Sequence, residues 1–424
     1  MNRSSFRAGM YLLENLTSGM YNDPLSIYRE YIQNSVDSFD MIDRKRNKDY
    51  VVDIELDPFS RSIKIYDNGL GIPSNKAEET LSSIGDSDKR GLKLRGFRGI
   101  GRLGGIAFCD RAIFRTKAEG ETSESIQEWD CRKLKNILDL SHKSLTFKQI
   151  FQSITKFYRR NNLSKSGSYF EVTLHDVSSF KNHVFDIERV RNYLSQVAPV
   201  PFELNVFPFG RIIDDYLGEK LHRYGQYRIS INGEGLYKPY GSMVRTTKNK
   251  GGGIDHIEDI ELFSINIGKE KPIAYGWYGK RKELLGSISK GESCSGMRVR
   301  TGNIMIGNSH LLDKCFREDR FNSYVIGEIH VDSDELIPNS RRDDFIDNNE
   351  KTLFYNEVEK VVGLPISKEI RLKSRINNTI GDKKIAVFPS GKPHIMDDIA
   401  NEILILCGKC HKSHKILSKL KISN

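Results

Sequence analysis

The stretch REYIQNSVDS (Arg29–Ser38) carries three polar residues at a helical spacing. Glu30, Asn34 and Asp37 are separated by four and three positions, so a helix places all three on one face. Ile27 lies at a neighbouring angle on that helix, which brings the polar face close to the buried side. An isolated pattern of this kind is usually a solvated surface. Its interpretation therefore depends on the segments that follow it.

The segment IKIYDNGLGIP (Ile63–Pro73) predicts a strand that ends at Asp67 and is followed by Gly69 and Gly71. An aspartate at a strand end can accept a hydrogen bond from an exocyclic amine such as that of adenine. Glycines beside it let the backbone approach a flat ring closely. An ordinary Asp-Asn-Gly turn without a ligand is the alternative explanation.

The third stretch is GFRGIGRLGG (Gly96–Gly105), in which Gly99, Gly101 and Gly104 form a G-x-G-x-x-G pattern. The residues before it, KRGLKLR, are not an apolar strand, so a dinucleotide-binding fold is rejected. No Gly-Lys pair is followed by Ser or Thr at P-loop spacing. We interpret the stretch as a mobile lid whose backbone N–H groups surround phosphates. Nearby cations are Lys89, Arg95, Arg98 and Arg102.

Each stretch alone is weak evidence, but their order and spacing resemble the nucleotide-binding boxes of the GHKL superfamily. This superfamily includes gyrase B, the 90-kDa heat-shock chaperones, histidine kinases and MutL. The run SIGDSDK (Ser83–Lys89) is similar to the segment that opens the lid in the chaperone, MutL and MORC branches. The resemblance covers about residues 10–180 and implies a Bergerat-type sandwich of helices on a sheet that binds Mg-ATP. The expected activity is that of an ATPase, which converts ATP and water to ADP and phosphate.

The resemblance also implies roles for single residues. Asn34 would give its amide oxygen to Mg²⁺, Glu30 would deprotonate the attacking water, and Asp67 would select adenine. The residues expected to line the nucleotide site are Asn34, Asp37, Asp67, Gly69, Gly71, Ile72, Lys89, Gly96, Gly99, Ile100, Gly101 and Arg102.

A segment in the second half of the chain favours one branch of the superfamily, the 90-kDa heat-shock chaperones. DELIPNSRRDDF (Asp334–Phe345) is similar to the catalytic loop in the middle domain of the 90-kDa chaperones, where an arginine reaches the γ-phosphate. Either Arg341 or Arg342 would fill that role, and Arg341 is favoured because it directly follows Asn339-Ser340. GMRVRTGNIMIG, residues 296–307, is similar to a strand pair of the same domain. A surface loop with ordinary ion pairs is the alternative.

The expected fold class is α+β, with a helix-on-sheet ATP-binding domain at 1–182, a mixed α/β middle domain resembling a transducer at 183–365, and a basic tail at 366–424. The glycine-rich residues 85–105 are expected to form a flexible loop outside the core. Helices are expected at 24–46, 75–84, 187–197 and 349–362, and strands at 50–56, 62–66, 169–174, 227–231, 272–277, 296–299, 303–306 and 325–331.

The tail contains CGKCHKSH, which places Cys407, Cys410, His411 and His414 close together. Two cysteines separated by two residues, with histidines nearby, are typical of a zinc knuckle. Adjacent Cys410 and His411 cannot easily face one Zn²⁺ ion, so a fourth ligand would come from elsewhere in the chain or from another subunit. A basic tail without metal is the alternative.

Composition limits the setting of the protein. Four of the six cysteines are widely scattered in the chain, which is typical of a reducing compartment. We see no signal peptide and no apolar run long enough for a bilayer, so we expect a cytoplasmic protein without a membrane partner. The formal net charge of +10 is compatible with binding to nucleic acid.

Two functions follow from these observations. One is a chaperone-like ATPase, a nucleotide-driven conformational clamp on protein clients; the other is a MORC- or MutL-like ATPase clamp on DNA, in defence or genome maintenance. The sequence leaves open whether two copies of the chain form a homodimer when ATP binds. A nucleotide-gated module without turnover is disfavoured because Glu30 is present. Histidine kinases are also disfavoured, because only about twenty residues precede the first box.

Overall fold

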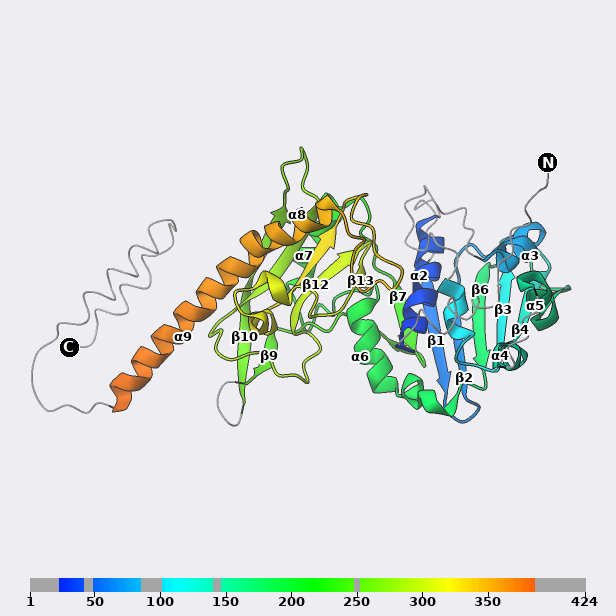
Figure 1. Cartoon of the computed structure of the whole chain (residues 1–424), viewed down its shortest axis with the longest axis horizontal. Helices are drawn as coiled ribbons and strands as arrows, with labels where there is room; N and C mark the ends of the chain where they lie inside the picture. Colours follow the sequence, from blue (N-terminus) through cyan, green and yellow to red (C-terminus); the bar gives the residue numbers. More distant parts are fainter. Residues whose placement is uncertain (1–22, 42–48, 85–100, 140–145, 248–251, 386–424) are drawn as a thin grey trace, which may run out of the picture. The chain divides into compact units, whose positions relative to one another are not determined.

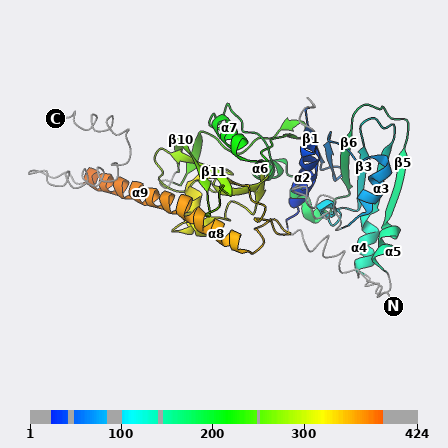
Figure 2. The ribbon, with the colours of Figure 1, turned by 90° about the horizontal axis from the view of Figure 1, so that it is seen from above.

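The computed structural model describes residues 23–41, 49–84, 101–139, 146–247 and 252–385. The chain through Lys373 forms one compact unit, and a second begins at Ser374. Within the first unit, two β-sheets are each covered by helices, and Figures 1 and 2 show them from two directions. The predicted α+β fold class is confirmed.

The first sheet has eight strands in the order β5-β4-β3-β6-β2-β1-β7-β8. Neighbouring strands are antiparallel except β1 and β7, which are parallel. Burial alternates along β1 and β2, as expected for a sheet with one face in the core. The strands are β1 (Val51–Asp57), β2 (Ser62–Asp67), β3 (Arg111–Lys117), β4 (Glu124–Asp130), β5 (Thr155–Arg160), β6 (Tyr169–His175), β7 (Arg228–Ile231) and β8 (Glu234–Gly235).

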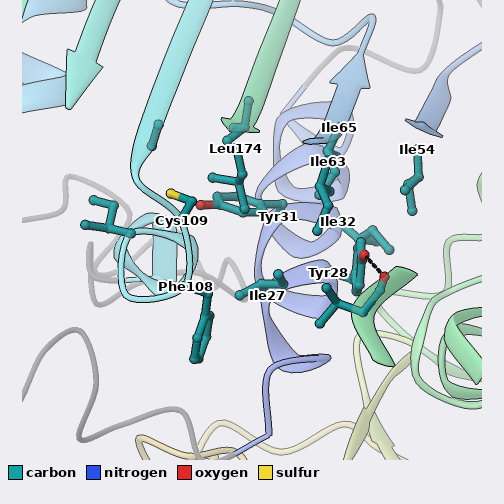
Figure 3. Packing of buried hydrophobic residues seen from close by; sticks show 14 of the residues in the cluster. Ile27, Tyr28, Tyr31, Ile32, Ile54, Ile63, Ile65, Phe108, Cys109 and Leu174 are labelled. Carbon is teal, nitrogen blue, oxygen red and sulfur yellow. Dashed lines mark hydrogen bonds between the residues drawn. The ribbon is translucent and has the colours of Figure 1, made fainter. Parts of the chain in front are cut away.

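Helices pack on one face of this sheet and form the first hydrophobic core with it. In Figure 3, Tyr31 of α2 lies beside Leu174 of β6, and Ile27, Ile32 and Ile63 belong to the same core. The elements that contribute to this core are α2 (Ser26–Asp40), α3 (Ser74–Ser82), the 3-10 helix η2 (Gly101–Gly105), α4 (Cys131–Asp139), α5 (Phe147–Ile154), η3 (Ser179–Phe185) and α6 (Ile187–Val197).

The end of the glycine-rich stretch corrects one expectation. Residues 101–105 were predicted to be part of a flexible loop outside the core, but they form η2, and the Leu103 side chain is fully buried. Glycine allows this packing, because a Cβ at Gly105 would lie 2.5 Å from the hydroxyl of Tyr31. Residues 85–100 lie outside the described part of the chain.

The second sheet has six strands in the order β13-β12-β14-β11-β10-β9, with β12 and β14 parallel. Its strands are β9 (Met243–Thr246), β10 (Gly253–Ile265), β11 (Ala274–Arg281), β12 (Gly296–Thr301), β13 (Ile304–Ile306) and β14 (Ile326–Val331). The helical elements of this half are α7 (Gly210–Lys220), η4 (Asp313–Cys315), η5 (Asp319–Tyr324), α8 (Asn349–Val358), the π-helix η6 (Glu359–Gly363) and α9 (Leu364–Ile385).

A buried ionic cluster lies on β14 of the second sheet, with Glu328 at its centre. Its carboxylate accepts hydrogen bonds from Lys238 Nζ at 2.8 Å, Arg300 Nε at 2.6 Å and Tyr240 OH at 3.0 Å. Arg300 also donates to the carbonyl oxygen of Gln196, the penultimate residue of α6, at 2.6 Å. The cluster therefore ties β12 and β14 to a helix of the first core.

Most of the predicted elements are present with shifted ends, and helix 187–197 has the predicted bounds. The elements that were not predicted are strands β3, β4, β5, β8, β9 and β10 and helices α4, α5 and α7. Strands β7 and β8 follow residue 182 and still belong to the first sheet, so the sheet does not end at the expected domain boundary. The described part of the expected tail, through Ile385, is helical. None of the helices in the described residues combines the length and the apolar composition needed to cross a lipid bilayer.

Candidate functional site

Asp67 is the last residue of β2 and is almost fully buried, with 2% of its surface exposed. Its Oδ2 accepts a hydrogen bond from Ser35 Oγ of α2 at 2.7 Å, and its Oδ1 accepts one from the backbone N–H of Gly69 at 2.9 Å. A buried carboxylate requires such partners. The first and second predicted boxes are thus joined directly, through a serine that the sequence patterns did not identify.

The two glycines after Asp67 allow the backbone to pass very close to its neighbours. A Cβ at Gly69 would lie 2.5 Å from Ser38 Oγ. Gly71 has a φ of +65°, and a Cβ there would lie 2.0 Å from the carbonyl oxygen of Lys117. These positions require glycine because a side chain has no room at either one and Gly71 also has left-handed backbone.

Two hydroxyl side chains fix the loop that follows β2. Ser168 Oγ donates to the carbonyl oxygen of Gly69 at 2.5 Å, and Thr116 Oγ1 accepts from the N–H of Ile72 at 2.8 Å. Both residues are buried. Thr116 is the penultimate residue of β3 and Ser168 directly precedes β6. They were not predicted as site residues, because their proximity to β2 depends on long-range strand pairing.

Glu30 brings three distant segments to one point. Its side chain is 10% exposed, and Oε2 would lie 2.6 Å from a Cβ at Gly101, so the carboxylate packs directly on the backbone of η2. Its Oε1 lies 3.5 Å from Arg29 Nη2 and 3.4 Å from Arg342 Nε. A residue of α2, the end of the glycine stretch and the second half of the chain therefore meet at this carboxylate.

The other two residues of the predicted polar face follow along α2. Asn34 is half-buried one turn after Glu30, and Asp37 is fully buried. The buried face of α2 thus includes acidic and amide side chains among apolar ones, which agrees with the predicted position of the polar face near the core.

The geometry distinguishes the two candidate arginines. The Arg342 side chain is 13% exposed and faces Glu30. Arg341 is exposed, and its carbonyl oxygen accepts a hydrogen bond from Arg29 Nη2 at 3.2 Å. The sequence argument favoured Arg341, whereas the geometry favours Arg342. Arg342 also has left-handed backbone, with a φ of +57°, which the sequence pattern did not reveal.

Several predicted site residues lie outside the described part of the chain: Lys89, Gly96, Gly99, Ile100, Cys407, Cys410, His411 and His414. Arg102 belongs to η2, but its side chain is not described. Among the described residues there is no group of three or more His, Cys, Asp or Glu side chains that could hold a metal ion. The four proposed zinc ligands lie outside the residues searched, so the predicted zinc knuckle stays a prediction.

Comparison with known proteins supports the resemblance drawn from the sequence motifs. Residues 25–159 match the model of the histidine kinase-, DNA gyrase B- and HSP90-like ATPases, which confirms the predicted resemblance to the GHKL superfamily. A 150-residue segment is 27% identical to chaperone protein HtpG of Halalkalibacterium halodurans, covering 31% of this chain and 24% of that protein. Chaperone protein HtpG of Coxiella burnetii is 26% identical over 140 residues, covering 28% of this chain and 22% of that protein.

These relatives support the HSP90-like branch of the superfamily. The matched region spans only about a quarter of the length of each. The similarity therefore applies to the ATPase domain and does not extend to the whole architecture of a chaperone.

Proposed function

We propose that this protein binds Mg-ATP between α2, β2 and η2 and hydrolyses it, with Glu30 as the base that orients and deprotonates water. The observation that carries the proposal is the position of the Glu30 carboxylate between Gly101 and Arg342. A general base must lie within reach of a water molecule that attacks the phosphate. Backbone N–H groups at a glycine-rich turn beside that base would bind the phosphates.

Other residues near Glu30 have side chains suited to bind adenine and the magnesium ion of Mg-ATP. Asp67 is buried and held in place by Ser35 and Gly69, which suits a carboxylate that accepts from the adenine amine. The amide oxygen of Asn34 is the kind of hard ligand that magnesium prefers. Magnesium would supply positive charge that neutralises the phosphate oxygens.

Arg342 would stabilise negative charge on the γ-phosphate. It is paired with Glu30, and its guanidinium would exchange this carboxylate for a phosphate oxygen, because an arginine binds both groups with similar geometry. We expect Arg342→Ala to lower the turnover of ATP by about 100-fold, while Arg341→Ala leaves it nearly unchanged. Equal rates for the two variants, or a larger loss in Arg341→Ala, would reject the assignment.

Lid closure over ATP would couple the nucleotide state to movements of the second half of the chain. We propose a conformational clamp on protein clients, following the similarity to chaperone protein HtpG. The net charge of +10 supports the second candidate, a clamp on DNA. ATPase rates with an unfolded client protein and with duplex DNA separate the two. Stimulation by DNA, together with binding that weakens steeply as salt rises, would favour the second candidate.

A further inference from the structure

Arg342 lies in a short hairpin that is closed by backbone hydrogen bonds. An antiparallel bridge joins Pro338 to Phe345, and the N–H of Asn339 donates to the carbonyl oxygen of Asp344 at 2.8 Å. The N–H of Arg342 donates to the carbonyl oxygen of Asn339 at 3.1 Å. The hairpin therefore has a defined shape, and the direction of Arg342 depends on where its base is attached.

Helix α8 holds the base of this hairpin. The Asp344 carboxylate accepts hydrogen bonds from Tyr355 OH at 2.6 Å and from Lys351 Nζ, which lies 2.7 Å from Oδ2. The next residue, Phe345, is buried and packs edge-on against Phe354 of α8, with ring centroids 5.9 Å apart. Two polar contacts and one aromatic contact thus join the hairpin to a single helix.

The charge of Asp344 is well suited to this attachment. Partial burial alone would raise the pKa of its carboxyl group, but the hydrogen bonds from Lys351 and Tyr355 outweigh burial and hold that pKa below its usual value. The carboxylate is therefore ionised at neutral pH, and charge-assisted hydrogen bonds of this kind are stronger than neutral ones.

We propose that Asp344 is a positioning residue for Arg342: by binding Lys351 and Tyr355 it fixes the hairpin on α8 so that Arg342 reaches the Glu30 carboxylate. Asp344 does not touch the proposed substrate and acts only through the arginine two residues earlier. The inference rests on the proposed ATPase function. The inference goes beyond that function, because the position of α8 would then determine whether Arg342 reaches Glu30.

The test combines single and double variants. Asp344→Asn and the milder Tyr355→Phe should each lower kcat for ATP by about 10-fold, because a displacement of about 1 Å at a reacting group can cost up to 100-fold. KM for ATP should change little, since nucleotide binding is assigned to α2 and β2. Asp344→Asn added to Arg342→Ala should cause no further loss, because residues that act as a unit are not additive.

The matched control is Asp347→Asn. Asp347 also binds Lys351 at 2.7 Å, but its side chain is 97% exposed and lies outside the hairpin. This variant should keep the wild-type kcat. A kcat loss in Asp347→Asn equal to that in Asp344→Asn, or a double variant whose loss is the product of the two single losses, would overturn the inference.

A second readout does not depend on turnover. Hydrogen exchange of the backbone amides of Arg342 and of Gly307, which donates to the Arg342 carbonyl oxygen at 2.8 Å, should accelerate in Asp344→Asn and stay unchanged in Asp347→Asn. Unchanged exchange in Asp344→Asn would overturn the inference even if the protein hydrolysed no ATP. If Arg342→Ala hydrolyses ATP slowly but Asp344→Asn hydrolyses it at the wild-type rate, the inference about Asp344 fails and the proposed role of Arg342 stands. If Arg342→Ala hydrolyses ATP at the wild-type rate, both the proposed role of Arg342 and the inference about Asp344 fail.

Discussion

The substitution Gly101→Ala should separate catalysis from stability. A Cβ at position 101 would lie 2.6 Å from Glu30 Oε2, and ordinary contact begins at 3.4 Å, so the carboxylate must move by roughly 0.8 Å. The moving atom is the end of a flexible side chain, and alanine is favoured over glycine in a helical turn. We therefore expect the free energy of unfolding to change by less than about 1 kcal/mol.

The same displacement should be costly for hydrolysis. A shift of about 1 Å at a reacting group can lower the rate by about 100-fold, so kcat should fall by about 10- to 100-fold. Single-turnover hydrolysis of ATP and urea unfolding of the same variant measure the two effects. The matched control is Gly218→Ala in α7, where a Cβ would meet nothing within 4 Å. A Gly101→Ala variant with normal kcat would refute the placement of the Glu30 carboxylate at the reacting centre.

Three further outcomes are expected. Asp67→Asn should weaken ATP binding by about 10- to 100-fold in calorimetry, because loss of one hydrogen bond to a charged acceptor costs about 1.5–3 kcal/mol, and unchanged affinity would remove Asp67 from the site. Glu328→Gln should lower the free energy of unfolding by about 3–5 kcal/mol in urea titrations, since it leaves Lys238 and Arg300 buried without a counter-charge. A loss below about 1 kcal/mol would contradict that account. Burial raises the pKa of Glu328, but Arg300 and Lys238 outweigh it and hold the pKa well below its usual value. The stabilisation that the ionised Glu328 carboxylate gives the folded state is therefore complete above about pH 4.3 and is lost as the pH falls further. In acid, the free energy of unfolding should therefore fall more steeply with decreasing pH in wild type than in Glu328→Gln.

Local patterns were sufficient to predict where the acidic candidate residues lie on their helix and strand. The spacing in α2 placed Glu30, Asn34 and Asp37 on one face, and Asp67 was recognised from its position at a strand end. These features depend on residues within a few positions of each other. Helix and strand periodicity act on that scale, so they can be read without knowledge of the tertiary structure.

The features that were missed depend on contacts between distant segments. Ser35 and Ser168 hold the site through partners that are 32 and 99 residues away. Arg342 faces Glu30, which lies 312 residues earlier in the chain, and neither this contact nor the left-handed backbone of Arg342 is visible in the motif. Glycine content alone also suggested a flexible loop at 101–105, where close packing on Tyr31 instead requires glycine.

The most direct test of the central claim is a paired measurement on Glu30→Ala: equilibrium binding of ATP and its hydrolysis under single-turnover conditions. If Glu30 is the base, the variant should bind ATP with an affinity within about 3-fold of wild type and lose at least about 100-fold in hydrolysis rate. Retained hydrolysis at the wild-type rate would contradict the account.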